Sequence, residues 1–150
     1  MGYITSEGLK QLLNYKYKSG GYTWLDNQIN PFWEASVKLI PEWVAPNLIT
    51  FVGWIFVILS YANMLRYDYT FKEDLPSSCF FFAAFCIFTY MNLDAIDGKQ
   101  ARRTKTSSPL GQLFDHGCDS FSVAFTMLAV CQAVKCSKEE AFFIFIVDCC

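Results

Sequence analysis

The sequence predicts an all-α protein: a polytopic transmembrane helical bundle preceded by N-terminal amphipathic helices at the membrane interface. Three observations lead to this fold class. Hydrophobic residues make up 53% of the 150 residues and charged residues only 17%, whereas soluble domains carry about a quarter of charged residues. Long runs without any charge follow one another along the chain, and the segment before them has apolar residues at helical spacing.

The segment 1–42 predicts amphipathic helices lying at the interface. Apolar residues recur at helical spacing in 6–17, and the glycine pair at 20–21 then breaks the chain. Pro31 predicts the start of a second short helix over 31–40, because proline is tolerated at the first helical position. A soluble amphipathic helix has the same pattern, so the interfacial interpretation depends on the apolar runs that follow.

The segment 43–150 predicts three full membrane spans and the start of a fourth. The first uncharged run, 43–65, has 23 residues, and a helix of that length exceeds a hydrocarbon core of about 30 Å. The second run is 75–93 and the third is 120–134. The apolar run from 141 onward begins a fourth span.

Charge predicts the orientation and excludes one class of partner. Basic residues gather in 99–105, after the second run, whereas acidic residues balance the basic ones in 66–74. The positive-inside rule therefore places the N-terminus and 99–105 in the cytoplasm. A net charge of -2 without a long basic run argues against a nucleic-acid partner.

Four aspartates form the constellation that predicts chemistry. Asp94 and Asp97 are three residues apart, and Asp115 and Asp119 are four apart, so each pair lies on one face of a helix. Carboxylates inside a membrane protein are costly and usually functional. Two hard divalent cations would compensate their mutual repulsion, and such a site is typical of two-metal phosphoryl chemistry.

Small residues around the aspartates indicate close packing. Ser108 and Pro109 predict the start of the helix that carries the second pair. Gly111 and Gly117 have no side chain, so we expect both to let this helix approach its neighbour closely.

The residues after the first pair suggest a phosphate site. Gly98 leaves room for a phosphate to approach the backbone, and Arg102 can offer its guanidinium to phosphate oxygens. We expect Lys99, Arg103 and Lys105 to be solvated residues of the positive-inside type rather than ligands.

These residues form a motif that resembles a known family. The pattern D-x-x-D-G-x-x-A-R over 94–102, eight further residues, and then G-x-x-x-D-x-x-x-D over 111–119 matches the CDP-alcohol phosphotransferase signature without departure. The longer stretch 93–120 is similar to eukaryotic choline/ethanolamine phosphotransferases, and the resemblance covers most of 3–134. Members of that family have a longer membrane domain, so we expect the chain to be an N-terminal part of one.

The resemblance implies an activity and assigns roles. It implies transfer of phosphocholine or phosphoethanolamine from CDP-choline or CDP-ethanolamine to diacylglycerol, giving phosphatidylcholine or phosphatidylethanolamine and CMP. Two Mg²⁺ or Mn²⁺ ions would be bound by Asp94, Asp97, Asp115 and Asp119. The substrate-binding residues would be Asn47, Gly98, Arg102 and Gly111.

Two residues are candidates for the general base. The last aspartate, Asp119, often has that role in the wider family, but a metal-bound carboxylate is a poor base because the cation stabilises its ionised form. His116 is the single histidine of the chain, and its reference pKa of about 6.5 suits proton removal near neutral pH. We favour His116 as the base and keep Asp119 as metal ligand and alternative base.

Other interpretations stay open. The substrate alcohol could be inositol, serine or glycerophosphate, or the chain could bind a CDP-alcohol and metal without turnover. An intramembrane prenyltransferase also pairs aspartates with Mg²⁺, although the spacing of Gly98, Arg102 and Gly111 argues against it. The family further implies an endoplasmic reticulum or Golgi membrane and a homodimer.

Overall fold

The computed structural model describes residues 5–14 and 23–148, and this part of the chain contains helices and no strands. Six helices follow one another: α1 (Ser6–Leu13), α2 (Trp24–Leu39), α3 (Pro46–Tyr67), α4 (Ser77–Arg103), α5 (Pro109–Ala133) and α6 (Lys138–Asp148). The predicted all-α class is confirmed. The predicted break at 20–21 lies outside the described residues.

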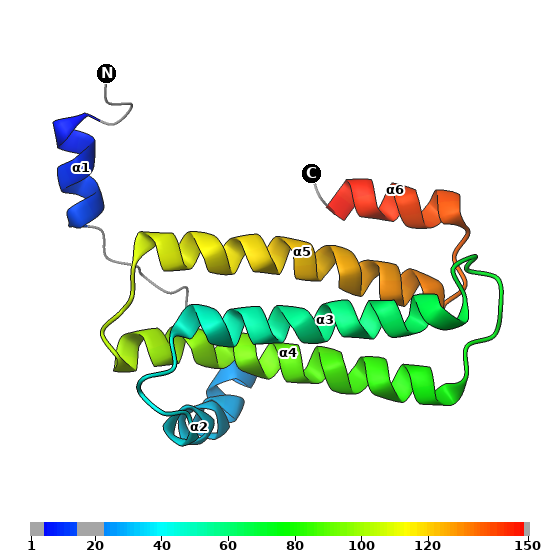
Figure 1. Ribbon diagram of the computed structural model, residues 1–150, viewed down its shortest axis with the longest axis horizontal. Helices are drawn as coiled ribbons and strands as arrows, with labels where there is room; N and C mark the ends of the chain where they lie inside the picture. The colour runs from blue at the N-terminus through cyan, green and yellow to red at the C-terminus, as the bar shows by residue number, and fades with distance from the viewer. Residues whose placement is uncertain (1–4, 15–22, 149–150) are drawn as a thin grey trace.

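Three long helices form the body of the molecule. α3, α4 and α5 lie side by side, and each runs antiparallel to the one before it (Figure 1). α3 packs extensively against both α4 and α5, whereas α4 and α5 contact each other only slightly. α2 crosses α4 near its C-terminal end, and α6 returns along α5. The start of α3, the end of α4 and the start of α5 therefore meet at one end of the bundle.

Two of these helices are long and apolar enough to cross a membrane. They are α3, with 22 residues, and α4, with 27, and they correspond to the first two predicted spans. α5 has 25 residues but begins at Pro109, well before the predicted span 120–134. Its first half carries Asp115, His116 and Asp119, which lower its mean hydropathy, and it does not join α3 and α4 as a candidate span.

The distribution of polar residues inside the bundle suits a lipid surrounding. Buried polar side chains occur on all three long helices: Thr50, Ser60, Gln100, Ser122 and Gln132. Large apolar side chains such as Phe81, Phe85 and Phe88 are exposed. Small and polar residues at helix interfaces, with apolar residues outside, are typical of membrane helices.

α2 begins earlier than its sequence predicts. Thr23 and Asp26 form a capping box, in which the Thr23 hydroxyl accepts the Asp26 N–H and the Asp26 carboxylate accepts the Thr23 N–H. The helix therefore starts at Trp24, and Pro31 lies inside it. The prediction that Pro31 starts the helix is wrong. The two capping hydrogen bonds at Thr23 stabilise an earlier start, and this stabilisation outweighs the loss of the one backbone hydrogen bond that Pro31 cannot donate.

Only some of the glycines bring helices together. A Cβ built on Gly53 would lie 3.3 Å from Cδ2 of Tyr90 and 3.5 Å from Cβ of Leu93, so the absence of a side chain lets α3 approach α4. A Cβ on Gly111 would meet neighbouring atoms at 3.2 Å and 3.4 Å. A Cβ on Gly117 would have nothing within 4 Å among the residues that the structure describes. The prediction of a close approach at Gly117 is wrong for this part of the chain, because no described helix packs against that position.

Asp68 organises the connection between α3 and α4. Its carboxylate accepts hydrogen bonds from the N–H groups of Thr70, Lys72 and Glu73 at 2.6, 2.8 and 3.0 Å, and its carbonyl accepts one from Gln132 of α5. Burial by itself raises the pKa of the Asp68 carboxyl, but the bonds from the Thr70 side chain and from these backbone groups outweigh it and lower the pKa to about 2.

Candidate metal centre

Two helices carry the four aspartates to the same end of the bundle. α4 continues without a break from its apolar part through Asp94 and Asp97. α5 begins at Pro109, and the Ser108 hydroxyl caps it by accepting the Gly111 N–H at 3.0 Å. The predicted start of this helix is confirmed.

The four aspartates form one acidic cluster, consisting of Asp94, Asp97, Asp115 and Asp119. Its members belong to two groups, and within each group the potential ligand atoms all lie within 4.8 Å of one another. The first group is Asp94, Asp97 and Asp115, and the second is Asp115, His116 and Asp119. Asp115 is shared, so the geometry offers two adjacent sites that use one carboxylate in common.

The cluster fits divalent cations in a further respect. Oδ1 of Asp115 is buried and accepts no hydrogen bond from the described residues. An unsatisfied buried carboxylate oxygen is costly, and a hard cation that binds oxygen would satisfy it. The four aspartates offer carboxylate oxygens, the donor type that suits Mg²⁺ and Mn²⁺.

Two residues that sequence reasoning missed hold the cluster. The Thr50 hydroxyl of α3 donates to Oδ2 of Asp97, and the Tyr90 hydroxyl of α4 donates to Oδ1 of Asp119 at 2.8 Å. A weak signal was present for each. Tyr90 precedes Asp94 by one helical turn, and Thr50 follows Asn47 by three residues, so each lies on the face of a predicted site residue.

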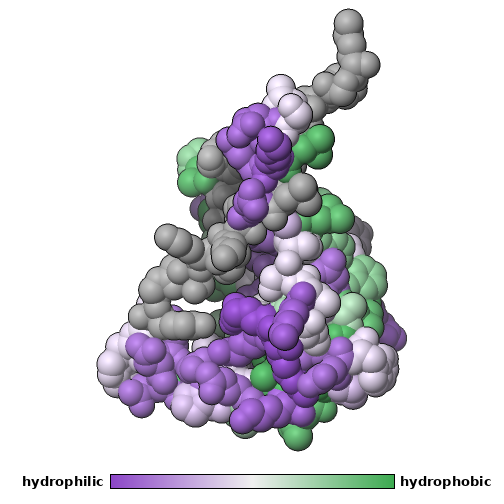
Figure 2. Space-filling model, turned by 90° about the vertical axis from the view of Figure 1, so that its left-hand side faces the viewer, coloured by the Kyte–Doolittle hydropathy of each residue, from purple (hydrophilic) through white to green (hydrophobic). Residues whose placement is uncertain are grey.

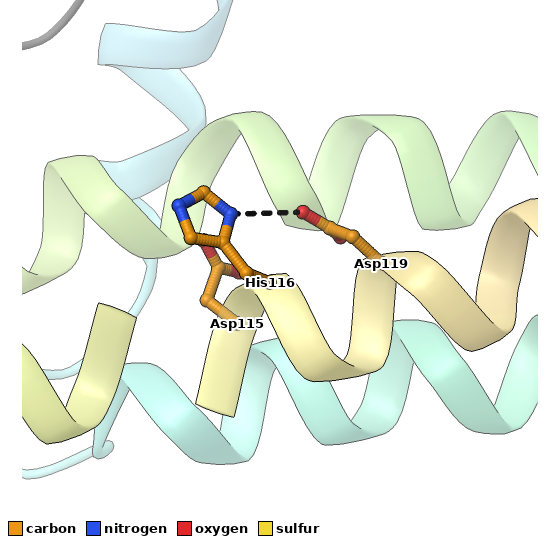
Figure 3. A group of neighbouring side chains, drawn as sticks. All are labelled: Asp115, His116 and Asp119. Carbon is orange, nitrogen blue, oxygen red and sulfur yellow. Dashed lines mark ion pairs between the residues drawn. The ribbon is translucent and has the colours of Figure 1, made fainter. Parts of the chain in front are cut away.

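His116 lies next to the cluster rather than inside it. Its Nδ1 is 4.0 Å from Oδ2 of Asp119, and its Nε2 is 3.3 Å from Nε2 of Gln112. Figure 3 shows Asp115, His116 and Asp119 projecting from one side of α5. The His116 side chain is 62% exposed, so a reacting hydroxyl could reach its ring.

A cavity of about 960 Å³ opens over the cluster. All of the site residues predicted from the sequence line it: Asn47, Asp94, Asp97, Gly98, Arg102, Gly111, Asp115, His116 and Asp119. Figure 2 views this end of the molecule, where hydrophilic residues gather. A Cβ on Gly98 would lie 3.5 Å from Nη1 of Arg102, an ordinary contact distance, so Gly98 lies directly beside this guanidinium.

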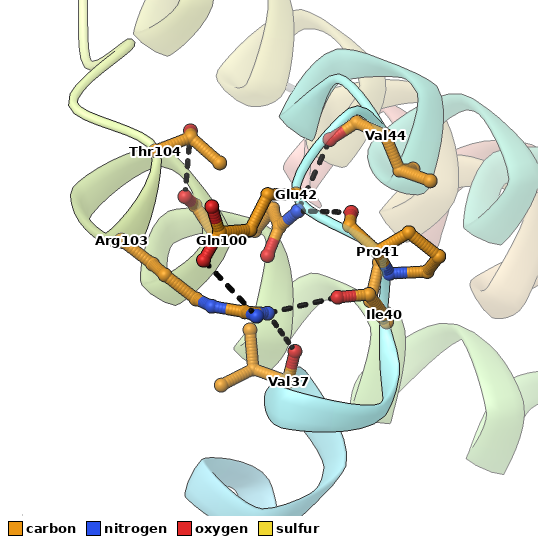
Figure 4. Close-up of polar contacts among 8 residues, drawn as sticks. All are labelled: Val37, Ile40, Pro41, Glu42, Val44, Gln100, Arg103 and Thr104. Atoms are coloured by element: carbon orange, nitrogen blue, oxygen red, sulfur yellow. Dashed lines mark hydrogen bonds and ion pairs between the residues drawn. The ribbon is translucent and has the colours of Figure 1, made fainter.

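Arg103 and Gln100 of α4 hold one wall of this cavity. Nη1 of Arg103 donates to the carbonyls of Val37 and Ile40 at 2.7 and 2.8 Å, and Nε2 of Gln100 donates to the carbonyls of Pro41 and Val44 at 3.0 and 3.1 Å (Figure 4). These bonds fix the connection 40–45 between α2 and α3, and its residues from 42 onward line the cavity.

The prediction that three basic residues are merely solvated needs correction. Arg103 binds the end of α2 and pairs with Glu42 at 3.4 Å, and Nζ of Lys99 donates to Oδ1 of Asn30 in α2. Lys105 is exposed, as predicted. The two exceptions arise because α2 folds back across α4, which no local pattern indicates.

The fold and the site together define a class of protein: an all-α bundle with two candidate membrane spans among the described residues and, at one end, a cluster of carboxylates that could hold a metal ion. Comparison with known proteins assigns it further. The family description "CDP-alcohol phosphatidyltransferase" matches residues 43–149, and the chain belongs to that family.

Relatives within the family show the same assignment. The chain is 40% identical to "Choline/ethanolaminephosphotransferase 1" of Arabidopsis thaliana over 146 residues, which cover 95% of this chain and 37% of that protein. It is 42% identical to "Cholinephosphotransferase 1" of Xenopus laevis over 132 residues, 88% of this chain and 33% of that protein. The chain thus spans about a third of the length of these curated relatives.

Proposed function

We propose that the chain carries the reaction centre of an enzyme that transfers phosphocholine or phosphoethanolamine from CDP-choline or CDP-ethanolamine to diacylglycerol. The products are phosphatidylcholine or phosphatidylethanolamine and CMP. The observation that supports this most directly is the presence of two groups of candidate metal ligands that share Asp115 and line the cavity. The relatives of the chain are named as choline- and ethanolaminephosphotransferases.

In this proposal the acidic cluster holds two Mg²⁺ or Mn²⁺ ions. Asp94 and Asp97 serve one ion, Asp119 serves the other, and Asp115 is shared, as the two groups of ligand atoms suggest. When bound, the ions supply electrostatic stabilisation of the negative charge on the phosphoryl oxygens.

Residues of the cavity wall bind and orient the nucleotide substrate. The Arg102 guanidinium donates to phosphate oxygens, and the open space at Gly98 admits the diphosphate close to α4. Asn47 and Gly111 also line the cavity, and a Cβ on Gly111 would be 3.4 Å from Oδ1 of Asn47. Glycine therefore leaves the Asn47 amide accessible to the substrate.

His116 accepts the proton of the diacylglycerol hydroxyl. That oxygen forms a bond to the β-phosphorus, the bond from this phosphorus to the bridging oxygen breaks, and CMP leaves with the bridging oxygen. Asp119, 4.0 Å from the His116 ring, faces the imidazolium that results. The alternative is that Asp119 accepts the proton itself.

The bundle lies in a membrane of the endoplasmic reticulum or Golgi, with the acidic cluster at the cytoplasmic end. Basic residues at the end of α4 favour this orientation. The amphipathic α2 lies at the interface beside them. The complete enzyme forms a homodimer.

Release of CMP tests the proposal. The chain is incubated in liposomes with diacylglycerol, CDP-choline or CDP-ethanolamine, and Mg²⁺, Mn²⁺ or EDTA. We expect CMP release that needs the metal and is lost in Asp97→Ala, and the faster substrate identifies the alcohol. Inositol, serine and glycerophosphate serve as competing alcohols, and CMP release that depends on one of them in place of diacylglycerol would reassign the alcohol.

The matched control is a longer chain, extended to the full length of the relatives. Release by the longer chain alone would mean that the reaction centre needs helices outside this segment. Metal-dependent nucleotide binding without release by either chain would contradict the proposal and establish a non-catalytic binding protein.

A further inference from the structure

Two hydroxyl groups link the three long helices through the acidic cluster. Thr50 of α3 donates to Asp97 of α4, and Tyr90 of α4 donates to Asp119 of α5. Each bond crosses one helix interface, and the partners are 47 and 29 residues apart in sequence. The two bonds therefore fix carboxylates relative to neighbouring helices and not only within their own.

The bond from Thr50 is directed at Asp97. The Thr50 hydroxyl has one proton and two acceptors in reach, Asp97 and the Pro46 carbonyl at 3.3 Å. The carboxylate is much the closer acceptor, and a bond to an ionised oxygen is about twice as strong as a neutral one. Thr50 is only 3% exposed, so its hydroxyl is largely shielded from solvent and held against Asp97.

The two donors are divided between the two groups of ligands. Asp97 belongs to the first group and Asp119 to the second. Each candidate cation site thus has one carboxylate that accepts a hydrogen bond from a hydroxyl that is not itself a candidate ligand. The shared Asp115 has a buried oxygen without a hydrogen bond from the described residues.

We propose that Thr50 and Tyr90 are positioning residues of the metal centre, each holding one carboxylate in place for one of the two cations. This inference rests on the proposed function, because it assigns roles at the same centre. Without these donors, repulsion within the cluster turns Asp97 and Asp119 away from the cations. Loss of a hydrogen bond to a ligating residue typically costs about 10- to 100-fold in metal affinity.

Titration with Mn²⁺ in the absence of nucleotide tests this directly. Free Mn²⁺ is followed by electron paramagnetic resonance for the chain in detergent micelles. The parent binds two ions. Thr50→Val preserves shape and removes the donor, and we expect it to weaken one binding event by about 10- to 100-fold. Tyr90→Phe weakens the other to a similar degree, and Thr50→Ser retains near-parental affinity because it keeps a hydroxyl.

Matched controls separate positioning from general stability. Thr89→Val removes a hydroxyl that donates to the Phe85 carbonyl of its own helix, and Tyr61→Phe removes the hydroxyl of a ring that packs near Phe125. Both should bind Mn²⁺ like the parent. Unfolding midpoints in EDTA report stability without metal, and positioning requires the Mn²⁺ affinity to change while these midpoints stay close to those of the controls.

The outcomes distinguish the two proposals. Parental Mn²⁺ affinity in both Thr50→Val and Tyr90→Phe, with binding lost in Asp97→Ala, would overturn the positioning roles and leave the metal centre intact. Absence of Mn²⁺ binding by the parent would overturn the metal centre and the positioning roles together. A lower EDTA midpoint with unchanged affinity would make the two residues structural and would also overturn the inference.

Discussion

Replacement of Arg103 by methionine should loosen the wall of the cavity without unfolding the bundle. Methionine keeps much of the aliphatic stem and removes every donor. The lost contacts are the bonds to the Val37 and Ile40 carbonyls at 2.7 and 2.8 Å, which satisfy carbonyls at the C-terminal end of α2. Contacts between α3, α4 and α5 are untouched.

The structure sets the magnitude of this effect. Removing a charged donor from a buried acceptor costs about 1.5–3 kcal/mol. The Arg103 side chain is 29% exposed, so water replaces part of the loss. Its pair with Glu42, which is 72% exposed, adds at most about 1 kcal/mol. The lost contacts together cost about 2 kcal/mol, and this raises the fraction of molecules in which segment 37–45 is locally unfolded by about 30-fold.

Hydrogen exchange measured by mass spectrometry checks this prediction. Peptides covering 37–45 should exchange about 30-fold faster in Arg103→Met, since exchange follows the open population. Peptides from the middle of α3 should be unchanged. Arg66→Met, at the other end of α3, is the matched control. Equal exchange of 37–45 in the two variants would refute the view that Arg103 holds this segment.

Two further predictions concern the bundle itself. Asp68→Asn should destabilise the chain at neutral pH. Because the pKa of Asp68 is lowered to about 2, the stabilisation by its carboxylate is complete above the unfolded value of about 3.9 and is lost as the pH falls through about 2. The parent's thermal midpoint should therefore fall more steeply than the variant's between about pH 4 and pH 2, and parallel curves would contradict this. Gly53→Leu should destabilise by about 1–3 kcal/mol, because even a Cβ lies 3.3 Å from Tyr90. Gly117→Ala, whose Cβ meets nothing within 4 Å, is the control, and equal midpoints for these two variants in detergent would show that α3 and α4 are not closely packed at Gly53.

Local rules predicted much of the site. Spacings of three and four residues place carboxylates on one helix face whatever the helix packs against, and the Ser108-Pro109 start depends only on capping and on the fixed proline backbone. The structure brings these residues together at one end of the bundle, where all nine predicted site residues line one cavity. The family match over 43–149 agrees with the motif.

Other features depend on contacts between residues far apart in sequence. Thr50 meets Asp97 because α3 packs against α4, and Tyr90 meets Asp119 where α4 and α5 contact each other directly. Arg103 binds α2 because that helix folds back across α4.

The sequence by itself therefore determined the helical class, the acidic motif and the family, because periodicity, capping and spacing are properties of neighbouring residues. Tertiary structure alone decided which hydroxyls hold the carboxylates, which basic residues fix the cavity wall, and which glycines matter. Gly53 and Gly117 show the reason plainly. Both are glycines within long helices, yet among the described residues only the first has another helix against it, and a glycine permits close approach only where a partner is present.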